Sequence, residues 1–162
     1  MVDNVLEQLC ERFEAGGAQF RVMHHEAGGQ SSESVAKIRG TELGQGAKAL
    51  CCTVKGNGVK AHVLAVLPAD KQADLARLAQ ALGARRASLA SPDEVLALTG
   101  CVFGAVPPVS LHPDLKLVAD PTLFTRYEEL VFNAGARDVS IFIRTDDYRR
   151  VAEPQIIEFV KD

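Results

Sequence analysis

The chain has 162 residues, of which 47% are hydrophobic and 6% aromatic, so it is long enough to bury one sizeable core. Its formal charge of −3 argues against a protein that coats nucleic acid, although a local basic patch could still contact one end of one. No apolar run approaches membrane-spanning length, and the N-terminus lacks a basic region followed by an apolar signal core. We therefore expect a single cytoplasmic domain over residues 1–162, with no membrane association.

The first part of the chain predicts two helices and one strand. Apolar residues recur at helical spacing over residues 5–13, and Gly16-Gly17 can end that helix. Alternating apolar residues over 20–24 are typical of a strand. Gly28-Gly29 then breaks the chain, and a short helix is expected from Ser31-Ser32 to Gly40.

The centre of the predicted sheet is a hairpin. Its two runs, 49–54 and 59–67, are rich in Val, Leu and Cys, and Asn57-Gly58 supplies the positive φ angles of a tight turn. Because the runs are almost continuously apolar, other elements should cover both faces. Lys48, at the entry to the first run, is therefore out of place. Either its stem lies along apolar surface with the ammonium in water, or the ammonium meets an anion in a cleft.

Helices and strands continue to the end of the chain. A helix is expected over 75–82, after Pro68-Ala69-Asp70, followed by a connecting segment over 87–90. Ser91-Pro92-Asp93-Glu94 contains the cap, first-turn proline and capping-box glutamate of a helix that ends by Gly100. Beyond it the sequence predicts a rigid loop at 104–108, strands at 115–119, 139–143 and 156–160, a turn and a short amphipathic piece after Asp120-Pro121, and a helix capped by Thr145-Asp146-Asp147. The fold class is α+β, with a mixed, mostly antiparallel central sheet surrounded by helices.

Familiar catalytic constellations are absent from the sequence. Residues 44–48 have the glycines and lysine of a phosphate loop, but they lead into a strand where a nucleotide-binding loop needs a helix. The four histidines lack the spacing of a helical metal pair. The four cysteines lack metal or redox spacing, so we expect free thiols; Cys101 fits a small core residue better than a nucleophile, and Cys51 and Cys52 should point to opposite faces of a strand. We expect neither metal nor cofactor, and any catalysis must then use backbone groups, bound water or the substrate itself.

Three short motifs, in order, carry a resemblance. Lys48-Ala49-Leu50 on the first hairpin strand, the Gly-x-x-x-Pro pattern of residues 104–108 and Asn133-Ala134-Gly135 before a strand resemble the YbaK/prolyl-tRNA synthetase-associated editing domain family. Their order and spacing match over nearly the whole chain, from about Phe20 to the end. The resemblance implies a trans-acting aminoacyl-tRNA deacylase that hydrolyses the ester of mischarged tRNA.

The resemblance also implies roles for individual residues. Lys48 would approach the terminal nucleotide or its phosphate, and the Gly104 loop would present backbone N–H groups to the aminoacyl carbonyl. No side-chain nucleophile is needed, because the ester is already activated and the terminal ribose has a 2′-hydroxyl that can orient water. The pocket around the amino acid would be formed by Val102, Phe103, Ala105, Pro108, Asn133 and Gly135. Core packing for Phe103 and a turn-forming amide for Asn133 remain open alternatives.

The expected partner is the acceptor end of mischarged tRNA, and an aminoacyl-tRNA synthetase is a second candidate partner. The cations that could frame the acceptor end are Lys37, Arg39, Lys48, Lys55, Lys60, Arg85 and Arg86. The resemblance favours a small amino acid (Ser, Thr, Ala or Cys), with Ser and Thr ahead. Two other functions stay open: a non-catalytic module of the same fold that binds a tRNA end or a synthetase, and a small-molecule hydrolase or binding protein.

Overall fold

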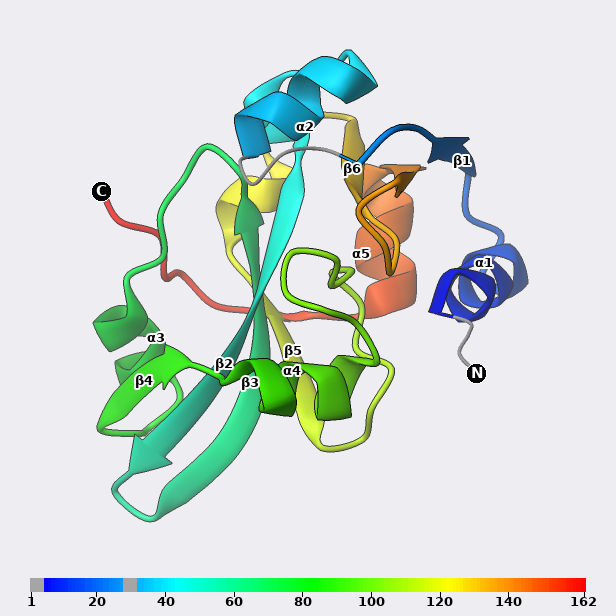
Figure 1. Cartoon of the computed structure of the whole chain (residues 1–162). Helices are drawn as coiled ribbons and strands as arrows, with labels where there is room; N and C mark the ends of the chain where they lie inside the picture. The colour runs from blue at the N-terminus through cyan, green and yellow to red at the C-terminus, as the bar shows by residue number, and fades with distance from the viewer. Residues whose placement is uncertain (1–4, 28–31) are drawn as a thin grey trace.

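The computed structural model describes residues 5–27 and 32–162, which form two β-sheets with helices packed around them (Figure 1). The smaller sheet has the strand order β1 (Phe20–His24), β7 (Val139–Arg144), β6 (Glu129–Asn133), and the larger has the order β4 (Arg86–Leu89), β2 (Ala47–Gly56), β3 (Val59–Pro68), β5 (Leu115–Ala119), β8 (Gln155–Ile156). In the larger sheet β3–β5 and β5–β8 pair in parallel, and all other neighbouring strands are antiparallel. The mixed, mostly antiparallel α+β prediction is confirmed, but with two sheets in place of one, which meet at a bridge between Gly46 and Val131.

The predicted hairpin runs through the middle of the larger sheet, and Figure 1 shows it extending along most of the molecule. Asn57 and Gly58 have φ angles of 56° and 81°, as a type I′ turn requires. Cys51 packs in a cluster with Val95 of α4 (Pro92–Thr99), whereas Cys52 packs with Leu78 of α3 (Leu75–Ala81). Both faces are thus covered, and the two thiols point to opposite sides as predicted.

The smaller sheet packs against α1 (Val5–Ala15) and α5 (Thr145–Ala152). Phe13 of α1 meets Phe132 of β6 with ring centroids 6.3 Å apart. Tyr148 of α5 is fully buried, and its hydroxyl donates a hydrogen bond to the Pro108 carbonyl at 2.6 Å. This bond fixes the C-terminal end of the loop predicted at 104–108 in the core.

Several other predicted elements are confirmed. They are α2 (Ser32–Arg39), α3, α4 with its complete capping box, the short helix η2 (Pro121–Phe124), β5 and β7. A 3-10 turn, η1 (Leu43–Gln45), leads into β2. The expected break at Gly28-Gly29 lies outside the described residues. Within the described residues, no helix is long and apolar enough to cross a bilayer.

Three local predictions were wrong. Residues 87–90 are not a simple connection, because Arg86–Leu89 forms β4 and satisfies the open edge of β2. The closing strand, predicted at 156–160, is only Gln155–Ile156, because the N–H groups of Phe159 and Val160 donate to the Asp120 carboxylate. Helix α5 exists, but Thr145 does not cap it, because its hydroxyl donates to the Tyr127 carbonyl.

Candidate functional site

A cavity of about 440 Å³ opens between α2, the start of β2 and the loop that follows α4. Its volume falls in the usual range for small-ligand sites. Apolar residues of the lining include Ala49, Cys51, Val95, Val106 and Phe132, and polar side chains come from Arg39, Thr41, Glu42, Lys48, Asn133 and Arg137. The cavity therefore combines an apolar floor with three cations, one carboxylate, one hydroxyl and one amide.

Lys48 lines this cavity from the first residues of β2. Burial lowers the pKa of its ammonium, and the nearby Asp70 carboxylate partly opposes that effect. Asp70 itself is held by a bidentate pair with Arg126, at 2.7 and 2.9 Å. Among the described residues, no carboxylate forms an ion pair with Lys48. The ammonium is thus half-buried in a cleft without a direct ion-pair partner among the described residues, which favours the interpretation in which it meets an anion.

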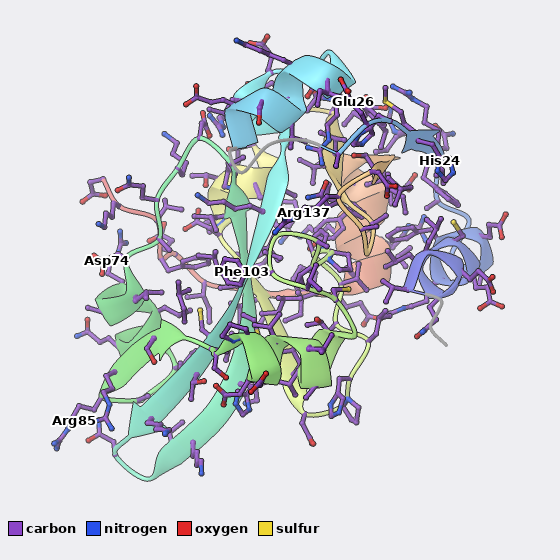
Figure 2. All side chains as sticks on the ribbon, in the orientation of Figure 1. His24, Glu26, Asp74, Arg85, Phe103 and Arg137 are labelled. Atoms are coloured by element: carbon purple, nitrogen blue, oxygen red, sulfur yellow. The ribbon has the colours of Figure 1, made fainter. Side chains whose placement is uncertain are left out.

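Gly104 lines the same cavity from a tight turn over residues 102–105. The Ala105 N–H donates to the Val102 carbonyl at 3.0 Å, and Gly104 has a φ of 87°, the geometry of a type II turn with glycine at its third position. The Phe103 carbonyl accepts a hydrogen bond from Arg137 at 2.7 Å, and Figure 2 labels both residues near the loop that follows α4. Because a trans peptide points its oxygen and hydrogen in opposite directions, the Gly104 N–H faces away from Arg137. Within the described residues this N–H has no acceptor, so it is available to a ligand.

A network of side-chain hydrogen bonds holds the Gly104 turn in place. Asn133 donates from Nδ2 to the Gly104 carbonyl at 2.6 Å, and its Oδ1 accepts from Nη2 of Arg39 at 2.8 Å. Nε of Arg39 donates to the hydroxyl of Ser140 at 2.9 Å, and this hydroxyl also bonds Nε2 of His25 at 2.8 Å. Burial lowers the pKa of Arg39 to about 10, so the guanidinium remains charged at neutral pH. The orientation of Asn133, and through it the position of Gly104, depends on this charged donor.

The structure brings only some of the predicted residues into the cavity. Lys48, Phe103, Gly104 and Asn133 line it. Val102 is exposed and does not line the cavity, and the side chain of Ala105 is fully buried. The amide and carbonyl of Ala105 are also occupied, the carbonyl by the N–H of Gly135 at 3.0 Å.

Two further motif residues, Pro108 and Gly135, also lie outside the cavity lining. Pro108 is buried and its carbonyl is hydrogen-bonded to Tyr148, and a Cβ on Gly135 would come within 2.9 Å of Val5. The structure thus places Ala105, Pro108 and Gly135 in the packed framework behind the cavity, whereas Val102 is exposed outside its lining.

Three residues near the cavity were missed as site residues: Arg137, Ser140 and His25. Arg39 was named only as one of several cations. Ser140 offered a usable signal, since it is a lone polar side chain within the apolar strand β7 and is fully buried. Arg137 offered none, because nothing in its sequence neighbourhood marks a residue that folds back onto Phe103.

The cysteines and most histidines do not provide reactive groups here. Burial raises the pKa of the thiols of Cys51 and Cys101, so both are protonated at neutral pH and poor nucleophiles. His62 pairs with Glu94 at 3.1 Å, and His112 accepts the N–H of Asp114 at 3.0 Å. In residues 5–27 and 32–162 no cluster of His, Cys, Asp or Glu could hold a metal ion. The groups of the lining that could act on a ligand are therefore Lys48, the arginines, the Glu42 carboxylate and backbone amides.

Comparisons with known proteins show which family the chain resembles over most of its length. The model of the aminoacyl-tRNA editing domain family matches residues 26–151. The chain is 63% identical over 153 residues to the "Multifunctional Ser/Thr-tRNA deacylase ProXp-y" of Escherichia coli (strain K12), covering 94% of this chain and 91% of that protein. It is 26% identical over 132 residues to the "Putative Cys-tRNA(Pro)/Cys-tRNA(Cys) deacylase EbsC" of Enterococcus faecalis (strain ATCC 700802 / V583), covering 79% and 76%. A solved structure described as "a putative trans-editing enzyme for prolyl tRNA synthetase" superposes with a TM-score of 0.81 at 21% identity, covering all of both chains.

Proposed function

This chain belongs to the aminoacyl-tRNA editing domain family, and we propose that it hydrolyses the ester of mischarged tRNA carrying a small amino acid, with Ser and Thr as its main substrates. The observation that carries the proposal is one cavity that joins an unpaired lysine to a free backbone N–H. The 63% identity to a Ser/Thr-tRNA deacylase supports the choice of amino acids. The resemblance seen in Lys48, Gly104 and Asn133 had already indicated the family correctly.

In this proposal Lys48 positions the substrate. Its ammonium binds a phosphate of the terminal nucleotides, since a half-buried cation without an ion-pair partner among the described residues gains much from a charge-assisted contact. The exposed ring of Phe103, at the cavity wall, offers a face on which the terminal base can stack. These contacts hold the ester against the Gly104 turn.

The Gly104 N–H then stabilises the oxyanion that forms when water attacks the ester carbonyl. A preformed backbone donor needs no reorganisation during the reaction, which is why such groups have large effects on rate. The 2′-hydroxyl of the terminal ribose orients the attacking water. The ester bond to the 3′ oxygen breaks, this oxygen takes a proton, and the free amino acid leaves. This route requires no side-chain nucleophile.

Steric exclusion of large amino acids is part of the proposal. The cavity of about 440 Å³ must hold the terminal nucleoside as well as the amino acid, and its apolar floor and the half-buried Asn133 lie beside the Gly104 turn, which leaves little room for a large side chain. Ser and Thr differ from Ala and Val by a hydroxyl, which the Asn133–Arg39 network can pair with. The protein would act in the cytoplasm on mischarged tRNA that a synthetase has released. A synthetase partner is a further possibility to test, because a structural neighbour is described as a trans-editing enzyme for one.

The decisive experiment measures deacylation of a panel of mischarged tRNAs, including Ser-, Thr-, Ala- and Cys-tRNA. We expect turnover with Ser and Thr above the others. The same assay with a 2′-deoxy terminal ribose and the amino acid on the 3′ oxygen should show nearly abolished turnover with binding retained. Cys101→Ala and His112→Ala serve as matched controls and should keep most activity. Binding of charged tRNA without turnover on any substrate would indicate a non-catalytic module, and normal reaction of the 2′-deoxy substrate would refute the assisted mechanism.

A further inference from the structure

A row of cations crosses three neighbouring strands at the turn end of the β2–β3 hairpin. Lys55 of β2 lies directly opposite Lys60 of β3 and directly opposite Arg86 of β4, so the three side chains share one face of the sheet. Arg85 precedes Arg86, and Figure 2 shows it projecting from this end of the molecule. All four are exposed, and none forms an ion pair with another described residue.

The fold holds this cation row together against its own repulsion. Like charges placed directly opposite each other on a sheet are destabilising. The Arg85 N–H nevertheless donates to the Lys55 carbonyl at 3.0 Å, and a Cβ on Gly56 would collide with the Cβ of Arg85. In a chain with a net charge of −3, four uncompensated cations at one place are unlike the rest of the surface.

A small polar pocket of about 180 Å³ lies beside the cation row and shares one lining residue with the cavity. Lys55, Arg86, Thr53 and Ser88 line this pocket, and Leu89 lines both it and the larger cavity. Glu94 supplies a carboxylate there, but Oε1 accepts the Ser91 N–H at 2.9 Å and Oε2 pairs with His62 at 3.1 Å. The carboxylate is therefore occupied, and the lining has hydroxyl and cationic donors to offer a phosphate.

We propose that the cation row binds backbone phosphates of the tRNA acceptor stem while the aminoacylated end occupies the cavity. This inference rests on the proposed function. Cys51, which lines the cavity, and Lys55 lie on the same face of β2, four residues or about 13 Å apart along an extended strand, whereas Lys48 points to the other face. Nucleotides stacked at roughly 3.4 Å each cover that span in about four steps, so the row meets the backbone where the single-stranded end joins the stem. Charge complementarity selects RNA backbone as the occupant.

The test compares a Lys55→Ala/Arg86→Ala variant with a Lys116→Ala/Lys161→Ala control of equal charge change. Lys116 and Lys161 are exposed, and Lys116 points to the opposite face of the sheet from Lys55. Affinity for a fluorescently labelled acceptor-stem RNA hairpin that carries no amino acid is measured by anisotropy across a salt series. We expect the affinity of the row variant to fall about tenfold at low salt. The slope of log Kd against log salt should fall by about 1.5, because each neutralised phosphate contributes roughly 0.7–0.9. The control variant should have the same affinity and the same salt slope as the wild type.

Deacylation separates this role from the chemistry. With full-length mischarged tRNA the row variant should raise KM about tenfold at unchanged kcat, whereas with aminoacyl-adenosine its kcat/KM should equal that of the wild type. Equal loss on both substrates, unchanged hairpin affinity, or reduced affinity only for a synthetase would each overturn the proposal. The hairpin assay needs no turnover. An absence of deacylation would therefore refute the proposed function, whereas the hairpin affinity alone decides whether the cation row binds the acceptor stem. The row variant should melt no lower than the wild type, since it removes only exposed, mutually repelling charges.

Discussion

Arg39 offers the sharpest test of how the site is held. Its planar guanidinium donates from two nitrogens at once, to Asn133 at 2.8 Å and to Ser140 at 2.9 Å. In the Arg39→Lys variant the charge is retained, but a single ammonium cannot reproduce a fork that reaches two acceptors. The substitution therefore removes the orientation of the Asn133 amide while leaving the cationic character of the cavity in place.

The size of the effect follows from these bonds. Losing a charge-assisted hydrogen bond to a buried partner costs about 1.5–3 kcal/mol. If the loss of this hydrogen bond to Asn133 raises the activation free energy at the Gly104 turn by the same amount, kcat falls about 10- to 150-fold, since each 1.36 kcal/mol is a factor of ten. Complete loss of an oxyanion donor, at roughly 100- to 1,000-fold, sets the upper bound. KM should change little, because Lys48 and Phe103 still hold the substrate.

Single-turnover deacylation of Ser-tRNA gives the rate of the chemical step, and steady-state kinetics gives KM. Arg77→Lys is the matched control, because Arg77 donates to the Val160 carbonyl at 2.8 Å on a different part of the molecule. In an Arg39→Lys/Asn133→Ala double variant the two losses should not add, because both act on the same contact to the Gly104 carbonyl. Wild-type kcat in Arg39→Lys, or losses that add in the double variant, would show that Arg39 does not position the turn.

Two further predictions concern single charged groups. Lys48→Ala should fold normally and lose at least tenfold in kcat/KM, because a charge-assisted contact contributes about 1.5–3 kcal/mol; unchanged activity would remove Lys48 from the site. Asp120 is buried and accepts hydrogen bonds from Thr122, Phe159 and Val160, and these outweigh burial and lower its pKa. Its stabilising effect is then complete above the unfolded pKa of about 3.9 and lost as pH falls through the folded value. Asp120→Asn should lower stability by about 2–4 kcal/mol at pH 7 and by less at pH 3, measured by thermal melting at both pH values; an equal deficit at both would contradict the assignment.

Local chemistry is what the sequence predicted best. The Asn57-Gly58 turn and the Ser91 capping box are decided by neighbouring residues, so both appear as expected. The division into two sheets depends on which strands meet across long separations, and no local pattern encodes that choice. The same holds for the closing strand, because Asp120 takes backbone donors some 40 residues away in the sequence.

The candidate site shows the same limit. Lys48, Gly104 and Asn133 were found because their motifs occur in a familiar order. Arg39 contacts Asn133 and Ser140 at separations of 94 and 101 residues, and only the folded chain brings these partners together. A buried hydroxyl in an apolar strand needs a partner, so Ser140 could have predicted that a polar group lies nearby, but not that it is Arg39.

The motifs themselves join the site to the core. In the Gly-x-x-x-Pro loop, Gly104 lines the cavity while the Pro108 carbonyl is bonded to buried Tyr148. In Asn133-Ala134-Gly135, the amide of Asn133 reaches Gly104 while the Gly135 N–H is bonded to the Ala105 carbonyl. In each motif, one end therefore lines the candidate site and the other end sets its position. Because both anchors are packed into the core, the Gly104 N–H is held in place before a substrate arrives, which is what the proposed mechanism without a side-chain nucleophile requires.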